Sequence, residues 1–151
     1  MSLNEIPFLR AIDFELISTN NYKGRGAVAL ISNEAGEILV HLRDNKSWIA
    51  HPNLWAFIGG VVEEGEDEKS GILREVQEEV GLEADGAEPI FRLVDIEGSQ
   101  NLITVFKIST RAHLSDLSLN EGQDFGFFSV EKLLKMPLVP FAKDLVQWLV
   151  K

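Results

Sequence analysis

A strand, a glycine pair and an acidic amphipathic helix follow one another in the middle of the sequence, and this order constrains the fold most. The short apolar run Leu54–Ile58 is expected to form a strand that stops at Gly59-Gly60. A helix is expected over Asp67–Val80, with Asp67 as its N-cap and Gly81 directly after its last turn. Four apolar residues of this helix fall within an arc of roughly 100°, which predicts packing on a sheet. They are Ile72, Leu73, Val76 and Val80.

Three glutamates occupy the neighbouring arc of the same helix. Glu75, Glu78 and Glu79 are spaced i, i+3 and i+4, so their carboxylates share one face. Carboxylates this close repel one another, and a divalent cation between them relieves the repulsion. Hard oxygen ligands favour Mg²⁺ or Mn²⁺ over Zn²⁺. Taken one at a time, each glutamate could equally be a solvated surface residue, as is expected of Glu63, Glu64 and Glu68 nearby.

Acidic residues are concentrated in this part of the chain. The 151 residues include 24 acidic and 14 basic ones, a net charge of −10. Residues 60–82 hold eight acidic and two basic residues and therefore carry −6 of that charge. Such a chain is not expected to bind nucleic-acid polymers or anionic membranes. Small polyphosphates are not excluded, because bound divalent cations reverse part of the local field.

The remaining elements interleave strands and helices, mostly through hairpins. The expected strands are Ala27–Ile31 paired with Ile38–Arg43, Ile90–Glu97 paired with Leu102–Thr110, and Phe125–Val130, and the expected last helix is Val139–Val150. The last helix has apolar residues at i, i+4, i+7 and i+8, and its apolar face is expected to pack on the sheet. This pattern predicts an α/β (α+β) fold with a mixed sheet and helices packed on it.

A chain of this length is expected to be one domain over residues 1–151, with a weakly patterned segment at 1–23. No apolar run reaches 18 residues and no signal peptide is evident, so a cytoplasmic protein is expected. The sequence has no cysteine, which excludes disulfides, zinc–thiolate sites and cysteine nucleophiles. The three histidines, His41, His51 and His113, show no paired metal spacing and are expected to be surface or core residues.

The segment from Gly60 to Leu82 resembles the signature of the Nudix (MutT-like) hydrolases, G-x5-E-x7-R-E-U-x-E-E-x-G-U, where U is aliphatic. Its fixed residues are Gly60, Glu66, Arg74, Glu75, Glu78, Glu79 and Gly81, and Val76 and Leu82 occupy the U positions. At roughly 6% usage per residue type, a chance match is on the order of 10⁻⁸ to 10⁻⁹ per start position. The resemblance implies an α/β/α sandwich with a central mixed β-sheet and a catalytic loop–helix–loop.

The resemblance also implies an activity and a set of site residues. Members cleave the diphosphate bond of a nucleoside diphosphate linked to another group, with water activated by Mg²⁺ or Mn²⁺. The metal ligands would be the carboxylates of Glu75, Glu78 and Glu79 and the backbone carbonyl of Gly59. Arg74 would orient Glu75, which is one candidate for the general base. Gly60 and Glu66 would shape the loop that enters the helix.

Glu121 is the second candidate for the general base and a further candidate metal ligand. It lies in Glu121-Gly122-Gln123, which resembles the segment that supplies one more glutamate in mutator-type members. The phosphate oxygens would need basic partners, for which Arg43 is the first candidate. Arg25 and Lys46 are weaker candidates.

The sequence departs from the family pattern before the helix, where Ile58 replaces the proline of many members. The chain also lacks an asparagine between Met136 and Asp144, which disfavours an oxidised guanine substrate. The expected substrate is a nucleoside triphosphate, ADP-ribose, a nucleotide sugar or a dinucleoside polyphosphate, bound by a monomer or a homodimer. The alternatives are a phosphatase-like member, a non-catalytic nucleotide-sensing module, and, last, an isomerase on the same fold.

Overall fold

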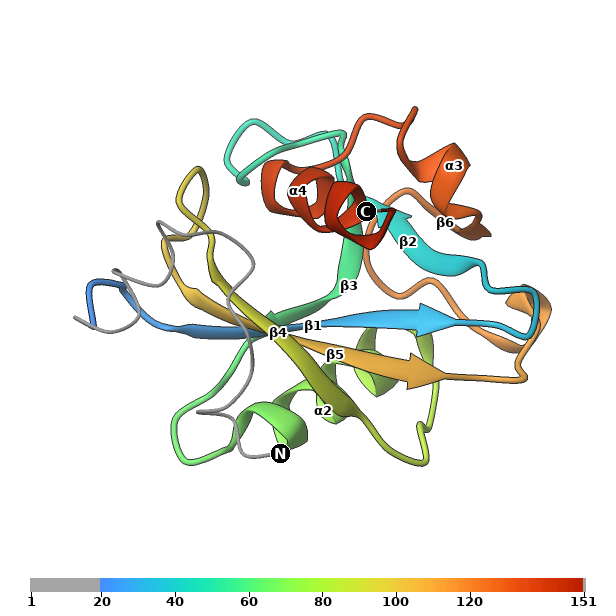
Figure 1. The fold of residues 1–151 in the computed structure, drawn as a ribbon, viewed down its shortest axis with the longest axis horizontal. Coiled ribbons are helices and arrows are strands. Elements are labelled where there is room, and N and C mark those ends of the chain that lie inside the picture. Colours follow the sequence, from blue (N-terminus) through green and yellow to red (C-terminus); the bar gives the residue numbers. More distant parts are fainter. Residues whose placement is uncertain (1–19, 151) are drawn as a thin grey trace.

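The computed structural model describes residues 20–150, and the expected weak patterning of residues 1–19 lies outside them. Among residues 20–150, three strands precede the first helix, and the last two elements are helices (Figure 1). The strands are β1 (Arg25–Ser32), β2 (Ile38–Leu42), β3 (Trp55–Val61), β4 (Glu88–Val94), β5 (Leu102–Ser109) and β6 (Asp124–Phe128). The helices are α2 (Glu68–Val80), the short 3₁₀ helix η2 (Leu114–Asp116), α3 (Val130–Leu133) and α4 (Pro140–Leu149). None of these helices is long and apolar enough to span a membrane.

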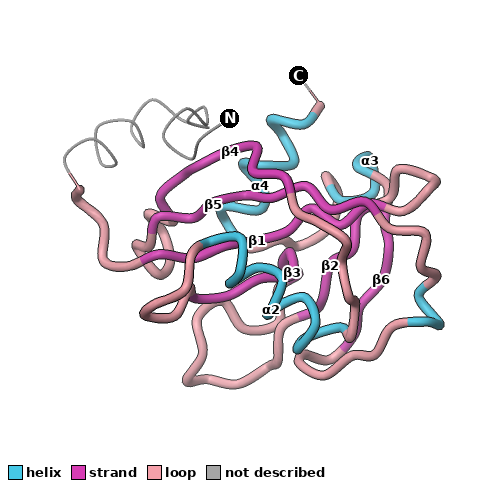
Figure 2. The backbone as a smooth tube through the Cα atoms, turned by 90° about the horizontal axis from the view of Figure 1, so that it is seen from below, coloured by secondary structure: helices cyan, strands magenta, loops and turns pink. Residues whose placement is uncertain are grey.

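The strands of the described part form one mixed sheet in the order β4-β5-β1-β3-β2-β6. β1 and β5 are parallel, and the other neighbours are antiparallel. Figures 1 and 2 show α2 on one face of the sheet and α4 on the other. The predicted α/β/α sandwich around a mixed sheet is therefore confirmed.

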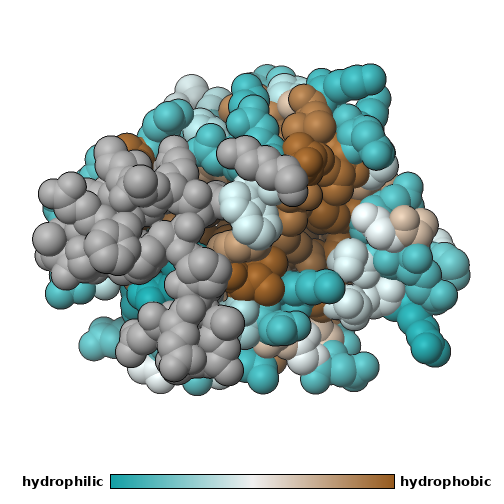
Figure 3. All heavy atoms as spheres, in the orientation of Figure 1, coloured by the Kyte–Doolittle hydropathy of each residue, from teal (hydrophilic) through white to brown (hydrophobic). Residues whose placement is uncertain are grey.

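Each face of the sheet carries its own apolar core, as strand alternation requires. Residues of β1 that face α2, such as Ala29 and Ile31, pack with Ile72 and Val76 of the helix. The alternate residues face α4 and pack with Leu145 of that helix, which is fully buried. The expected apolar face of α4 thus packs on its own sheet. Apolar side chains still reach the surface over α4 (Figure 3), where the Trp148 side chain is exposed along one edge.

Several expected boundaries shift for identifiable reasons. Ala27–Ile31 and Ile38–Arg43 do form a hairpin, but the two strands pair only at Ser32 and Ile38 next to the turn. Beyond that point β3 lies between them and takes over the pairing of both. The strand expected over Phe125–Val130 ends at Phe128, because Ser129 caps the short helix α3 through a hydrogen bond to the Lys132 N–H.

The expectation that the strand stops at the glycine pair is wrong, because β3 continues through both glycines to Val61. Both glycines pair with β1, which extends the strand, and Gly60 also leaves space for Glu75, since a Cβ on it would lie 2.6 Å from the Glu75 carboxyl carbon. Gly71 within α2 has a similar explanation, since a Cβ there would come 3.1 Å from a Glu66 oxygen. These glycines bring the strand and the loop close to the acidic face of α2.

Candidate active site

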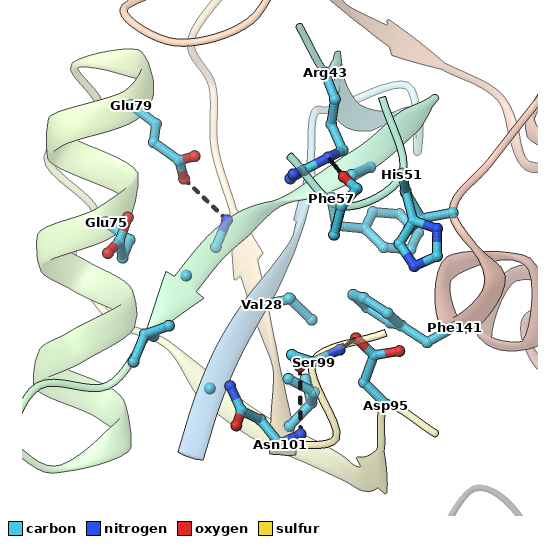
Figure 4. A pocket seen from close by; sticks show the side chains of 18 of the residues that line it. Val28, Arg43, His51, Phe57, Glu75, Glu79, Asp95, Ser99, Asn101 and Phe141 are labelled. Carbon is cyan, nitrogen blue, oxygen red and sulfur yellow. Dashed lines mark hydrogen bonds between the residues drawn. The ribbon is translucent and has the colours of Figure 1, made fainter. Parts of the chain in front are cut away.

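A cavity of about 510 Å³ opens between the acidic face of α2 and the loops that follow β2 and β4 (Figure 4). It lies within the size range of small-ligand sites. The predicted site residues that line it are Arg43, Gly59, Gly60, Glu75, Glu79 and Glu121. The predicted residues Arg25, Glu66, Arg74 and Glu78 lie outside its lining.

Glu79 is the most deeply buried of the predicted acids that line the cavity. Its carboxylate is only 6% exposed and accepts a hydrogen bond of 3.0 Å from the Gly59 N–H (Figure 4). Burial raises the pKa of Glu79 to about 9, and the negative charges of Glu121 and Glu75 add to the effect. Burial also raises the pKa of Glu75 above its ordinary value. The cavity therefore concentrates carboxylates in a place where negative charge is unfavourable.

Arg74 organises the acids at the edge of the cavity. Its guanidinium donates to Glu66 at 2.7 Å, to Glu75 at 2.9 Å and to Glu78 at 3.2 Å. A further bond of 3.2 Å reaches the Val61 carbonyl at the end of β3. The bond from Arg74 lowers the pKa of Glu66, which also accepts from the Glu63 N–H. Arg74 thus contacts both the loop glutamate and Glu75, the geometry expected of an orienting residue.

The segment that carries Glu121 is fixed to the C-terminal end of α2. The Asn120 backbone N–H donates to the Glu79 carbonyl at 3.0 Å, and its side-chain amide donates to the Glu78 carbonyl at 2.8 Å. The Ser118 N–H donates to the Val80 carbonyl at 3.0 Å. These bonds satisfy carbonyls that the last turn of a helix leaves unpaired. They also hold Glu121 next to Glu79 across 42 residues of sequence.

The other end of this segment contacts the loop that holds Arg43. The Gln123 side-chain amide donates to the Arg43 carbonyl at 2.8 Å and to the Asn53 side-chain oxygen at 2.9 Å. The Arg43 side chain in turn donates to the Ala50 carbonyl at 3.0 Å. Sequence reasoning missed Asn120 and Gln123, because their importance depends on contacts that no local pattern reveals.

His41 lies beneath the Glu121–Gly122 turn. The side chain is 5% exposed, and its Nδ1 has no hydrogen-bond partner among the described residues. Burial lowers its pKa, and the nearby Glu121 opposes this effect. Gly122 adopts φ +95°, and a Cβ there would lie 2.6 Å from the Leu42 carbonyl. His41 is buried, as expected of a core histidine, but it also borders the cavity.

The side chains of Arg25 and Lys46 contact residues that do not line the cavity. Arg25 forms an ion pair with Glu68 and donates to the Glu66 carbonyl at 3.3 Å, so it stabilises the start of α2. Glu68 is accordingly buried, contrary to the expectation of a solvated surface residue. Lys46 lies 3.5 Å from an Asp44 oxygen and over the exposed Trp48 ring. Among the basic side chains expected to bind substrate, Arg43 is the one that borders the cavity.

The donor set fits a hard divalent cation in its chemistry. Glu75, Glu79 and Glu121 border one cavity, and the Glu79 carboxyl group lies within hydrogen-bond reach of Glu121. Carboxylates this close, of which Glu79 is buried, favour a proton or a cation between them. Among residues 20–150, however, no three acidic or histidine side chains are already gathered as a formed metal site. Binding a cation would therefore require some movement of these side chains.

Comparison with known proteins agrees with this fold and site. The family model of the NUDIX domain matches residues 22–149. The CTP pyrophosphohydrolase of Escherichia coli (strain K12) is 33% identical over 113 residues, which are 75% of this chain and 82% of that protein. Nudix hydrolase 7 of Arabidopsis thaliana is 36% identical over 63 residues, which are 42% of this chain but only 22% of that longer protein. The crystal structure of a MutT protein from Methanosarcina mazei Go1 superimposes with a TM-score of 0.68 at 26% identity, covering 97% of this chain and 94% of that one.

The fold and the acidic cavity thus define a hydrolase of phosphoric anhydride bonds, the enzyme class to which the named relatives belong. The chain belongs to the Nudix family.

Proposed function

We propose that the chain is a Mg²⁺- or Mn²⁺-dependent pyrophosphohydrolase of a small nucleotide. The observation that carries this proposal is the meeting of Glu75, Glu79 and Glu121 at one cavity that also contains Arg43. A polyphosphate cannot approach three carboxylates unless cations neutralise them. The metal ligands would be these three side chains, Glu78 and the Gly59 carbonyl.

The residues of the chain have distinct roles in this proposal. When bound, the cation neutralises phosphate charge and acidifies a water molecule. Glu75 or Glu121 would act as the general base that accepts the proton of the attacking water. Arg74 orients Glu75 through its 2.9 Å bond. Arg43 binds phosphate oxygens from the side of the cavity opposite to α2.

Nucleoside triphosphates are the first substrate class to test, and CTP the first compound. The support for CTP is the relative from Escherichia coli, which is a CTP pyrophosphohydrolase and matches most of this chain. The cavity of about 510 Å³ is large enough for a nucleotide. ADP-ribose, nucleotide sugars and dinucleoside polyphosphates belong in the same panel.

The test combines this panel with substitutions on α2. Glu78→Gln and Glu79→Gln should each reduce Mg²⁺-dependent turnover by at least about 100-fold, measured as released phosphate or pyrophosphate. Glu83→Gln is the matched control, because Glu83 is an exposed acid just beyond α2 and should leave turnover unchanged. Near-wild-type turnover in both α2 variants would exclude the metal assignment. Nucleotide binding without turnover of any compound would favour the sensing module.

A further inference from the structure

A second group of polar side chains borders the cavity at the turn between β4 and β5. Asp95, Ser99 and Asn101 project into this end, which lies away from α2 in Figure 4. These three residues have no role in the proposed hydrolysis, because the reacting phosphates would lie next to α2. Their presence raises the question of which part of a substrate they contact.

The Asp95 carboxylate is fixed and offers one free acceptor. The residue is 6% exposed, and Ser99 donates to its Oδ2 twice, from the backbone N–H at 2.9 Å and from the hydroxyl at 3.1 Å. Within residues 20–150 no donor reaches Oδ1. Gly98 leaves the space for this arrangement, since a Cβ there would come 2.8 Å from Oδ1. Oδ1 therefore stays open to the cavity as an acceptor that a ligand N–H can reach.

Asn101 and Phe141 complete the group. The Asn101 side chain forms no hydrogen bond within the described residues and offers both a donor and an acceptor to the cavity. A Cβ on Gly24 would lie 2.9 Å from its Oδ1, so the glycine makes room for this amide. Phe141 lines the same cavity (Figure 4), and its ring offers a flat apolar surface suited to stacking on a base.

The charge of Asp95 decides which way round a nucleotide binds. A buried carboxylate repels phosphate, so the phosphates face α2 and Arg43 while the uncharged base faces Asp95. The free oxygen accepts an N–H, and an exocyclic amino group can approach it unhindered. The ring N–H of uracil lies between two carbonyl oxygens, which the carboxylate repels. In hypoxanthine one carbonyl oxygen flanks the ring N–H, so the carboxylate also disfavours this base relative to adenine, but less strongly.

We propose that Asp95 and Asn101, with Phe141, form a nucleobase subsite that selects cytosine or adenine over the corresponding keto bases. This inference rests on the proposed nucleotide hydrolysis and adds the substrate class to it. The first test needs no substitution: kcat/KM is compared for CTP against UTP and for ATP against ITP. At least one pair should show a preference of about tenfold or more for the amino base.

Asp95→Asn tests the residue itself. The carboxamide oxygen of asparagine can keep both bonds from Ser99, which turns the amide NH₂ towards the ligand. The amino-to-keto ratio of kcat/KM should then fall at least about tenfold, with turnover of the keto nucleotide rising. Asn101→Ala should reduce the preference as well. Glu97→Gln, an exposed change in the same turn, is the control and should keep the wild-type ratio.

The outcomes separate the two proposals. Hydrolysis without any preference between amino and keto bases, or an unchanged ratio in a folded Asp95→Asn protein, overturns the subsite. Absence of hydrolysis for every nucleotide refutes the proposed function instead. Thermal unfolding of each variant shows whether it is folded. If Asp95→Asn is unfolded, the amino-to-keto ratios of the wild type decide whether the subsite proposal stands.

Discussion

Replacing Glu79 with glutamine should make the metal-free protein more stable near neutral pH while it abolishes turnover. The Glu79 carboxyl group is 6% exposed, accepts from the Gly59 N–H and lies within hydrogen-bond reach of Glu121. Its pKa rises from an ordinary 4.5 to about 9 in the folded protein. Glutamine preserves these contacts, because its oxygen can accept from Gly59 and its NH₂ can donate to Glu121.

The magnitude follows from the difference in proton binding. Between pH 4.5 and about 9 the folded protein holds a proton on Glu79 that the unfolded chain has released, so stability falls as the pH rises. Each pH unit above 4.5 lowers the free energy of unfolding by about 1.4 kcal/mol. The loss at pH 7.5 is therefore at most about 4 kcal/mol. Movement of Glu121 and entry of water reduce this loss of stability. We expect a gain of about 1 to 4 kcal/mol for Glu79→Gln at pH 7.5 and less than about 1 kcal/mol at pH 4.5.

Urea unfolding of the metal-free wild type and variant, in chelator at pH 7.5 and pH 4.5, measures this gain. Adding Mg²⁺ at pH 7.5 should then stabilise the wild type more than Glu79→Gln, because the cation binds the folded carboxylates. Glu78→Gln is the matched control, since the Glu78 side chain on the same helix is 57% exposed. Its stability should change by less than about 1 kcal/mol at both pH values. A Glu79→Gln protein less stable than the wild type at pH 7.5 would refute the reasoning.

Two further substitutions test how the carboxylates are held in place. Gly60→Ala places a Cβ 2.6 Å from the Glu75 carboxyl carbon. It should lower the free energy of unfolding in urea by about 1 to 3 kcal/mol and lower kcat at least tenfold in steady-state assays. A wild-type kcat would show that the close approach is irrelevant. Asn120→Ala removes the 2.8 Å bond to the Glu78 carbonyl. It should cost only about 1 kcal/mol in the free energy of unfolding. It should also weaken Mn²⁺ binding, measured by titration calorimetry, about tenfold, and unchanged Mn²⁺ affinity would contradict the role given to Asn120.

The sequence was sufficient to predict the helix α2 and its ends, because both are set by local interactions. The Asp67 side chain accepts from the Ser70 N–H at 2.7 Å, and Gly81 adopts φ +70° after the last turn. The apolar arc predicted by the 3.6-residue period is buried against the sheet. The expected strands were also found, although their ends depend on neighbouring strands. The path of β3 through Gly59-Gly60 could not be predicted, since it requires the pairing with β1.

Helix geometry alone predicted only the contiguous part of the candidate site, and Glu121 was named only because its segment resembles that of a family. Glu75 and Glu79 follow from helix geometry, whereas the position of Glu121 depends on hydrogen bonds from Asn120 to the end of α2. Asp95 was assigned to a strand, and nothing local indicated that the turn after it would border the cavity. Arg25 shows the opposite error: it is basic and near the motif, but Glu68 forms an ion pair with it.

The net charge of −10 is less informative than how each acid is compensated. Arg25 and Arg74 pair with acids at the start and edge of α2, and these acids need nothing more from a ligand. Glu79 and Glu121 have no cationic side chain between them, and Glu75 shares Arg74 with other acids. Most acids elsewhere on the described surface, such as Glu83, are exposed, whereas burial makes negative charge most costly at the cavity. That cost is why the affinity of this cavity for divalent cations, and through them for polyphosphates, should exceed that of any other acidic cluster on the described surface.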